Sequence, residues 1–335
     1  MTSPFKLIAT AVAVVVAALV VPVGSSASND KVDGVRAEIK RGTLEVKSGD
    51  QDNAVALRLK AGDPTRIQVD AGDNGTDDFS FARGDVVAIN VKTGDGNDSV
   101  RIDDANGAFT NSIPTTIAGG DGNDTLEGGQ VQVAAENETF RGGNGNDLVD
   151  GGKGNDTANL GAGNDTFRWD NGEGSDAIEG QDGSDTMVFN GAAIAENVTM
   201  TANGGRLTFF RVQGNVTMDT DGVEIVEDNT LGGADTVTVD DLTGTDVTQT
   251  NLDLAGTLGG SAADGAVDSV VVNGTDGVDT IDIAGSGSGA DVSGLATAVS
   301  VEHPDPTDTL SVNTRAGTDS VFVNGVAGVI TVSVV

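Results

Sequence analysis

The sequence predicts an all-β fold, a parallel β-helix or β-roll solenoid, from three observations. A nine-residue pattern rich in glycine and aspartate recurs in the middle of the chain, and short alternating runs of Val, Ile and Leu follow it. Aromatic residues are scarce, with ten Phe, one Trp and no Tyr in 335 residues. Because each coil of a solenoid buries its inward residues by stacking on its neighbours, β-branched side chains suit it better than large aromatic anchors do.

The net charge of the chain limits its partners. There are 52 acidic against 18 basic side chains, a formal net charge of −34. Such a chain repels a phosphate backbone, so we expect no nucleic acid partner, and an anionic membrane surface is disfavoured for the same reason. Calcium fits this charge, since it takes six to eight oxygen ligands from carboxylates and carbonyls. The absence of cysteine excludes disulfides, cysteine zinc sites and thiol catalysis, and leaves bound metal as a way to hold loops.

Residues 1–27 resemble a secretory signal peptide. Lys6 precedes an unbroken apolar run over 7–21, and small residues at 25–27 offer a cleavage site. The alternative is an uncleaved membrane anchor, but a run of about 15 residues is shorter than the roughly 20 that a spanning helix prefers. We therefore expect cleavage, a secreted, extracellular protein, and no membrane insertion after cleavage.

The repeats decide the architecture. A degenerate copy of the nine-residue repeat, TGDGNDSVR, lies at 93–101. The aligned segments are GGDGNDTLE (119–127), GGNGNDLVD (142–150), GGKGNDTAN (151–159), LGAGNDTFR (160–168), NGEGSDAIE (171–179) and GQDGSDTMV (180–188).

Each residue type in this pattern has a physical role. Glycine enters φ > 0 regions freely, so a six-residue turn can aim its carbonyls at one point, and the aspartate that ends the turn adds a charged oxygen. Plain β-turns explain isolated Asn-Gly or Gly-Asp pairs, but not Gly-x-Gly-x-Asp at a nine-residue period with an apolar residue two places later. The apolar residues that we expect to point inward are Leu126, Leu148, Phe167, Ile178 and Met187, with Ala158 as the weak member.

This pattern resembles the RTX (hemolysin-type) calcium-binding repeat. The resemblance implies that a Ca²⁺ ion lies between turns of alternate repeats, so that 142–147 pairs with 160–165, and 160–165 with 180–185, on one edge. The opposite edge would pair 151–156 with 171–176. Three ions are expected, with one or two more if 93–98 and 119–124 extend the first edge. The implied ligands are the carboxylates of Asp98, Asp124, Asp147, Asp156, Asp165, Asp176 and Asp185, with the backbone of Gly143, Gly145, Gly152, Gly154, Gly161, Gly163, Gly172, Gly174 and Gly183.

The flanking segments keep a weaker form of the same pattern. We expect N-terminal β coils or a cap over 28–92, the calcium-binding roll over 93–189, and a degenerate C-terminal β-solenoid over 190–335. This last part resembles sequence in bacterial calcium-binding repeat proteins. Its expected strands start at Asp235, Asp246, Asp268, Asp279, Asp308 and Asp319, in pairs that are eleven residues apart. No linker stands out, so one elongated body is expected.

The sequence offers no catalytic motif. It lacks HExxH and GxSxG, and its only histidine, His303, lies in an expected turn beside Glu302 and Asp305. We therefore expect no catalytic residue, and a non-enzymatic surface, matrix or adhesive module with calcium ions as partners. The alternative is a glycan-active enzyme (lyase, epimerase or hydrolase) on a parallel β-helix, since a pair of carboxylates suffices for some glycosidases. A cell-surface glycan or matrix is then a further partner.

Overall fold

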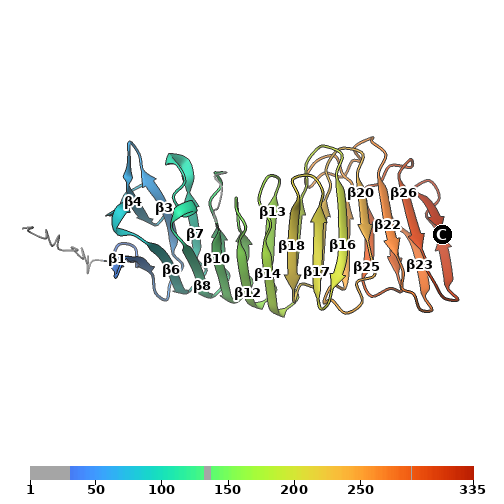
Figure 1. The fold of residues 1–335 in the computed structure, drawn as a ribbon, viewed down its shortest axis with the longest axis horizontal. Helices are drawn as coiled ribbons and strands as arrows, with labels where there is room; N and C mark the ends of the chain where they lie inside the picture. Colours follow the sequence, from blue (N-terminus) through green and yellow to red (C-terminus); the bar gives the residue numbers. More distant parts are fainter. Residues whose placement is uncertain (1–30, 132–136, 288) are drawn as a thin grey trace, which may run out of the picture.

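The computed structural model describes residues 31–131, 137–287 and 289–335, and the expected signal segment 1–27 lies outside these. The described chain forms one elongated stack of coils, with β1 near one end and residue 335 at the other (Figure 1). Among the described residues, no helix has the length and apolar character needed to cross a membrane. The expected all-β solenoid with parallel strands is therefore confirmed.

Two sheets of 14 strands each, within the described ranges, form the walls of the stack. The first sheet contains, in spatial order, β1 (Arg36–Lys40), β2 (Thr43–Lys47), β6 (Ala88–Asp95), β8 (Thr115–Asp121), β10 (Glu138–Asn144), β12 (Thr157–Gly163), β14 (Ala177–Gly183), β18 (Val216–Asp221), β17 (Arg206–Arg211), β16 (Asn197–Asn203), β20 (Thr236–Val239), β22 (Ser269–Asn273), β26 (Thr309–Asn313) and β28 (Thr331–Val334). The second sheet contains β27 (Ser320–Asn324), β23 (Thr280–Ser286), β24 (Gly289–Ser293), β25 (Ala298–Glu302), β21 (Gln249–Asp253), β19 (Ile225–Asn229), β15 (Thr186–Asn190), β13 (Thr166–Asp170), β11 (Leu148–Asp150), β9 (Thr125–Glu127), β7 (Ser99–Asp103), β3 (Ala54–Lys60), β4 (Asp63–Ala71) and β5 (Phe79–Ala82).

Most neighbouring strands are parallel, because each coil gives one strand to each sheet. Antiparallel insertions occur at β1–β2, β3–β4–β5, β16–β17–β18 and β23–β24–β25. Three single turns of 3-10 helix complete the described elements: η1 (Arg83–Asp85), η2 (Asp104–Asn106) and η3 (Thr110–Ser112). The last two connect β7 to β8 and lie over one edge of the stack.

The core is a set of columns, each built by residues in register on successive coils. In the second sheet the column runs through Leu126, Val149, Phe167 and Met187, all fully buried. The expectation that Leu148 points inward is wrong: Leu148 pairs with Thr125 on the partly exposed face, and Val149 takes the inward place. The repeat there reads Asn-Asp-Leu-Val, so an apolar residue stands where other repeats have Thr or Ala, and the alternation of strand faces decides the register.

The C-terminal strands follow the expected starts with one exception. β20, β22, β23, β26 and β27 each begin one residue after an expected aspartate. The start expected at Asp246 is wrong, because β21 begins at Gln249 and Thr248 occupies the place before the strand. Asp246 instead accepts a hydrogen bond from the Gly222 amide at 3.1 Å.

Candidate metal centre

The glycine-rich turns stack directly on one another along two edges of the solenoid. On the first edge, where the chain passes from the first sheet to the second, the turns are 93–98, 119–124, 142–147, 160–165 and 180–185. Their glycines are in register, Gly94 with Gly120, Gly120 with Gly143, and Gly143 with Gly161. The second edge stacks 151–156 on 171–176. The turn pairs expected from the resemblance are thus neighbours in space.

Glycine is required in these turns for two independent reasons. Gly143 has φ = +132°, a backbone conformation that side chains with a Cβ rarely adopt. A Cβ at Gly143 would also lie 2.0 Å from the carbonyl oxygen of Gly120 in the next turn. The same close approach recurs at other glycines of the stacked turns, so the backbone of each turn contacts the backbone of the next with no side chain between them.

The aspartates that end the turns form a continuous column on the first edge. One oxygen of each carboxylate accepts the backbone N–H of the acidic residue one coil earlier. The donor–acceptor distances are 2.8 Å for Asp98 to Asp124, 2.8 Å for Asp124 to Asp147, 2.7 Å for Asp147 to Asp165, 2.9 Å for Asp165 to Asp185 and 2.7 Å for Asp185 to Glu224. We call these six residues the first-edge column.

The residue before each aspartate forms a second set of hydrogen bonds along the edge, and in these the later coil donates to the earlier one. The N–H of Asn146 donates to Oδ1 of Asn123 at 2.7 Å, and the N–H of Asn164 donates to Oδ1 of Asn146 at 2.9 Å. The Asn-Asp pair therefore fastens each turn to both of its neighbours, which explains why both residue types recur at fixed places.

The second edge carries a shorter column of the same kind, which we call the second-edge column. The N–H of Glu138 donates to Oδ1 of Asp156 at 2.6 Å, and the N–H of Asp156 donates to Oδ1 of Asp176 at 2.7 Å. Gly152, Gly154, Gly172 and Gly174 lie in its turns, and Gly143, Gly145, Gly161, Gly163 and Gly183 lie in those of the first edge.

The second carboxylate oxygen of every expected ligand is buried and lacks a hydrogen-bond partner among the described residues. These atoms are Oδ2 of Asp98, Asp124, Asp147, Asp156, Asp165, Asp176 and Asp185. None of these seven carboxylates forms an ion pair with Lys or Arg in the described part of the chain. A buried charged oxygen without a partner is costly, and a hard cation that takes oxygen ligands removes that cost. The residues present therefore fit calcium.

Burial governs the electrostatics of both columns. It raises the pKa of Asp124 to about 6, of Asp147 to about 7 and of Asp185 to about 6, against the lowering effect of the backbone N–H that each accepts. On the second edge, burial raises the pKa of Asp176 to about 7. Burial together with the charges of Asp176 and Glu138 raises the pKa of Asp156. Without a cation, these columns hold a charge that the surrounding protein disfavours.

Two aspartates of the C-terminal coils, Asp279 and Asp308, look similar but use their oxygens differently. Asp268 donates its N–H to Oδ1 of Asp308 at 2.9 Å, as in the first-edge column. The other oxygen of Asp308 accepts the N–H of Asp305 at 2.6 Å, and Oδ2 of Asp279 accepts the N–H of Thr275 at 2.9 Å. Both oxygens of Asp308 thus accept backbone N–H groups, and Oδ1 of Asp279 accepts the Thr275 hydroxyl at 2.8 Å, so these two carboxylates close turns and leave no free ligand atom. Asp235 differs from them: its Oδ1 accepts the Glu196 N–H at 2.7 Å, and its Oδ2 is buried without a partner among the described residues.

Three carboxylates were missed by the sequence reasoning. Each takes the place of an aspartate at the start of a strand: Glu138 begins β10, and Glu196 and Glu224 directly precede β16 and β19. For Glu138 the signal was present, since Asn137-Glu138-Thr139 matches Asn-Asp-Thr with one substitution. Glu224 precedes Ile225 without glycines, and the sequence alone offers no comparable sign.

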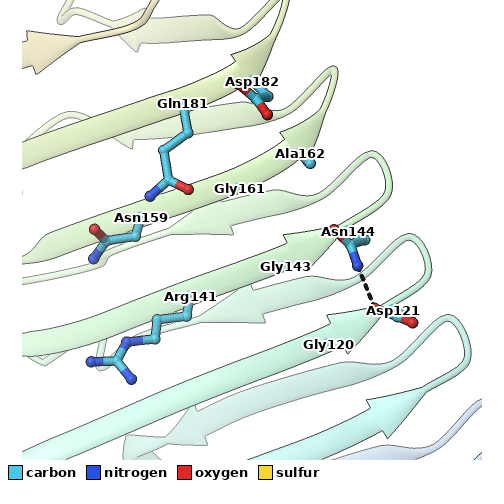
Figure 2. Close-up of a pocket in the computed structure, with 10 residues that line it drawn as sticks. All are labelled: Gly120, Asp121, Arg141, Gly143, Asn144, Asn159, Gly161, Ala162, Gln181 and Asp182. Atoms are coloured by element: carbon cyan, nitrogen blue, oxygen red, sulfur yellow. Dashed lines mark hydrogen bonds between the residues drawn. The ribbon is translucent and has the colours of Figure 1, made fainter.

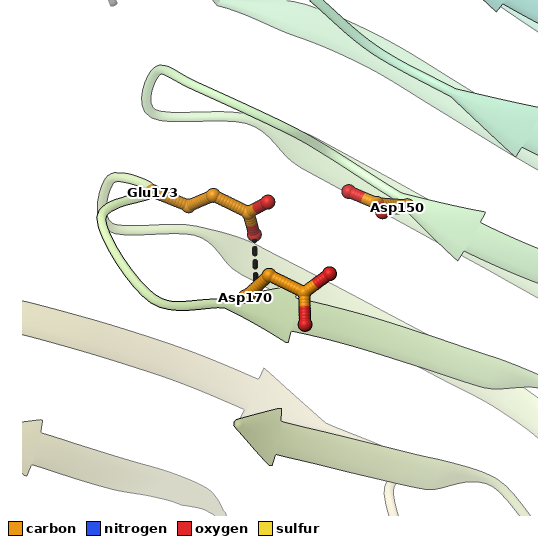
Figure 3. A group of neighbouring side chains, drawn as sticks. All are labelled: Asp150, Asp170 and Glu173. Atoms are coloured by element: carbon orange, nitrogen blue, oxygen red, sulfur yellow. Dashed lines mark hydrogen bonds between the residues drawn. The ribbon is translucent and has the colours of Figure 1, made fainter. Parts of the chain in front are cut away.

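Other polar groups lie outside the columns. Asp150, Asp170 and Glu173 bring one oxygen each within 4.8 Å of one another, and Glu173 accepts the Asp170 N–H at 2.7 Å (Figure 3). Arg168 already pairs with Asp150 at 2.5 Å. His303 places Nδ1 2.8 Å from Oδ1 of Asp253 and is partly buried, not a solvent-facing loop residue as expected.

A shallow groove of about 490 Å³ runs over the outer face of β10, β12 and β14 (Figure 2). Glycines form its floor, and the side chains of Arg141, Asn159 and Gln181 border it. Asn144 donates to Asp121 at 2.6 Å at one end of the groove. None of the described residues that line the groove is aromatic.

Comparison with known proteins agrees with the geometry. A family model of the RTX calcium-binding nonapeptide repeat matches residues 115–130, 134–167 and 171–191 in four copies. No curated protein and no solved structure matches the chain. RTX nonapeptide repeats bind Ca²⁺, the ion that the free carboxylate oxygens of both columns fit. The chain therefore contains RTX-type calcium-binding nonapeptide repeats, in the segment 115–191.

Proposed function

We propose that the protein is a secreted, non-enzymatic calcium-binding β-solenoid that folds when it meets calcium outside the cell and serves as a surface, matrix or adhesive module. One observation carries this proposal. Seven buried carboxylates in two columns each keep one oxygen without a partner among the described residues, and all seven lie in turns that neighbour one another. A set of charges spaced one coil apart is a poor way to stabilise a fold unless cations lie between them.

The same arrangement couples folding to binding. In a calcium-poor compartment the turns repel one another, so the strands between them gain little from stacking. When calcium is present, the ions bind the stacked turns and not the extended chain, and mass action then stabilises the folded state. Extracellular calcium modules bind at about 10⁻⁴–10⁻³ M, so the chain would stay unfolded before export and fold after it.

The proposal that the protein is not an enzyme rests on the side chains outside the two columns. His303 is paired with Asp253 across neighbouring strands, which satisfies its ring nitrogen Nδ1. The trio of Asp150, Asp170 and Glu173 is held by Arg168, by the Asp170 N–H and by other hydrogen bonds. Neither group opens into the groove on the outer face of the first sheet.

A second candidate, glycan binding, is favoured by that groove. Arg141, Asn159 and Gln181 offer guanidinium and amide groups that can hydrogen-bond sugar hydroxyls, in a row across three neighbouring strands (Figure 2). Arg141→Ala should then reduce retention on a polysaccharide matrix without changing calcium binding, and unchanged retention would remove this candidate. A catalytic version further requires turnover of the bound glycan.

Circular dichroism of the full secreted chain tests the calcium switch. We expect a β-sheet spectrum in millimolar calcium and loss of most of it after chelation, with recovery when calcium is restored. Identical β spectra in calcium and in chelator would reject the coupling of folding to calcium, even if calcium binds.

A further inference from the structure

The repeat that starts at Gly128 is incomplete, and we call residues 128–131 the worn turn. It keeps Gly128 and Gly129 but has Val131 where the other repeats have their next glycine, and Glu138 begins β10 at the place where an aspartate ends the other turns. Its N–H donates to Oδ1 of Asp156 at 2.6 Å, and Oδ1 of Asn137 accepts the Asn155 N–H at 3.0 Å. Glu138 therefore belongs to the second-edge column, one coil before Asp156.

The Glu138 side chain is buried without a partner. Only 1% of the residue is exposed, and neither carboxylate oxygen makes a hydrogen bond with a described residue. A glutamate carries one methylene more than an aspartate, so its carboxylate extends beyond the line of the column. It reaches the connection between β7 and β8, which belongs to no repeat.

That connection supplies more oxygen atoms. Asp104, in η2, is buried, and its Oδ2 accepts the N–H groups of Gln130 at 3.0 Å and Val131 at 3.3 Å, which ties η2 to the worn turn. Its Oδ1 is buried and has no partner in the described part of the chain. The hydroxyl of Thr110, in η3, is likewise buried without a hydrogen bond and lies beside the Glu138 carboxylate.

We propose that Glu138, Asp104 and Asp156, with the Thr110 hydroxyl, form a further calcium site in which a loop outside the repeats supplies ligands that the incomplete repeat lacks. The unpartnered atoms are all oxygens, which are the ligands that calcium takes. Asp104 and Asp156 each lie near enough to Glu138 to act on its carboxylate, and the described residues place no Lys or Arg beside Glu138. Uncompensated charges of one sign are costly in a buried place, and one divalent cation offsets most of their charge.

Electrostatics support the geometry. Burial raises the pKa of Glu138, and the charge of Asp104 raises it further, which shows that the two carboxylates lie close enough to interact. Glu138 also raises the pKa of Asp156. The site shares Asp156 with the turn pair 151–156 and 171–176, so it extends the second-edge column by one ion toward the N-terminus.

The test counts calcium ions bound to the full secreted chain by equilibrium dialysis. Glu138→Gln and Asp104→Asn should each bind one calcium ion fewer than the unaltered protein. Asp156→Asn should bind two fewer, because two sites share that carboxylate. Glu127→Gln is the matched control, since Glu127 lies on the outer face of β9 and should leave the count unchanged.

The outcomes separate this site from the calcium sites of the repeats. If the unaltered protein binds calcium and Glu138→Gln binds the same number, the further site is rejected while the repeats keep their function. If the unaltered protein binds none, both fail. A second measurement covers folding: at the lowest calcium at which the chain is still folded, Glu138→Gln removes a buried charge, so its melting temperature should rise above that of the unaltered chain. A fall under those conditions would contradict the proposal.

Discussion

Asp165 lies in the middle of the first-edge column, with Asp147 one coil before it and Asp185 one coil after it. Its Oδ1 accepts the Asp147 N–H at 2.7 Å, and its Oδ2 has no partner among the described residues. Asp165→Asn keeps an oxygen that can accept that N–H. It replaces the other oxygen by an amide NH₂ group, which cannot bind a cation.

The expected magnitude follows from the two turn pairs that Asp165 joins. Turn 160–165 stacks on 142–147 and on 180–185, so the substitution weakens two calcium sites at once. A tenfold weaker Kd at one saturated site lowers the free energy of unfolding by about 1.4 kcal/mol. For two sites the loss is about 2.8 kcal/mol, which should lower the melting temperature by several degrees.

The assay is thermal unfolding followed by circular dichroism, in saturating calcium and at the lowest calcium at which the chain is still folded. In calcium, Asp165→Asn should melt earlier. With calcium depleted it should melt later, because a buried charge with a like charge on either side has been removed. Asp308→Asn is the control: both of its oxygens accept backbone N–H groups, so its cost should be about 1 kcal/mol at both calcium levels.

A single result would refute this reasoning. If Asp165→Asn lowers the melting temperature by the same amount at both calcium levels, its carboxylate serves the turn and not a cation. It would then act as Asp308 does, and the difference between the two kinds of aspartate would have no consequence.

Three further predictions concern the same columns and the core. Gly143→Ala should destabilise the calcium-loaded chain by several kcal/mol in thermal unfolding, because its Cβ would meet the Gly120 carbonyl at 2.0 Å; a loss below about 1 kcal/mol would contradict the required close approach. At the lowest calcium at which the chain is still folded, the pKa values of Asp147 and Asp176 near 7 exceed the unfolded value of about 3.9, so the free energy of unfolding should be highest below about pH 4 and fall as pH rises to about 7. Denaturant titrations across that range check the sign, and a rise with pH would oppose it. Asp228 points into the core from β19 with neither oxygen hydrogen-bonded to a described residue, and burial raises its pKa well above the usual value. Asp228→Asn should therefore raise the free energy of unfolding by about 1–3 kcal/mol at pH 7.5 and much less at pH 4, whereas an equal change at both values would exclude a charge effect.

The fold and the first-edge turns could be predicted because their residues obey local rules. Glycine at the positive-φ places and aspartate at the end of each turn recur at a nine-residue period, and a period is visible in one sequence. Which turns stack is implied by the resemblance to the RTX repeat, in which turns of alternate repeats are neighbours. Asp147 and Asp165 are two repeats apart, and the structure places them one coil apart on one edge, as the resemblance implies.

The parts that could not be predicted depend on contacts between distant segments. Leu148 and Val149 are both apolar, and only their pairing with Thr125 and Leu126 on the previous coil shows which one points inward. Asp104 is separated from Glu138 by more than thirty residues, and its place at the second edge depends on how η2 folds over the worn turn. Sequence spacing carries no signal for such a contact.

The two uses of aspartate also need the structure. Asp165 and Asp308 both precede a strand, and both accept an N–H from the coil before. They differ in whether a backbone N–H of the same turn donates to the second carboxylate oxygen. In the turn before Asp308, the Asp305 N–H does so at 2.6 Å. In the glycine turns, the carboxylate is left for a cation.

Isothermal titration calorimetry of the full secreted chain with calcium, after chelator has been removed by dialysis, tests the central claim most directly. The account predicts saturable uptake of at least three ions per chain, with Kd values of about 10⁻⁴–10⁻³ M and release of protons on binding. The absence of saturable uptake at millimolar calcium would contradict it.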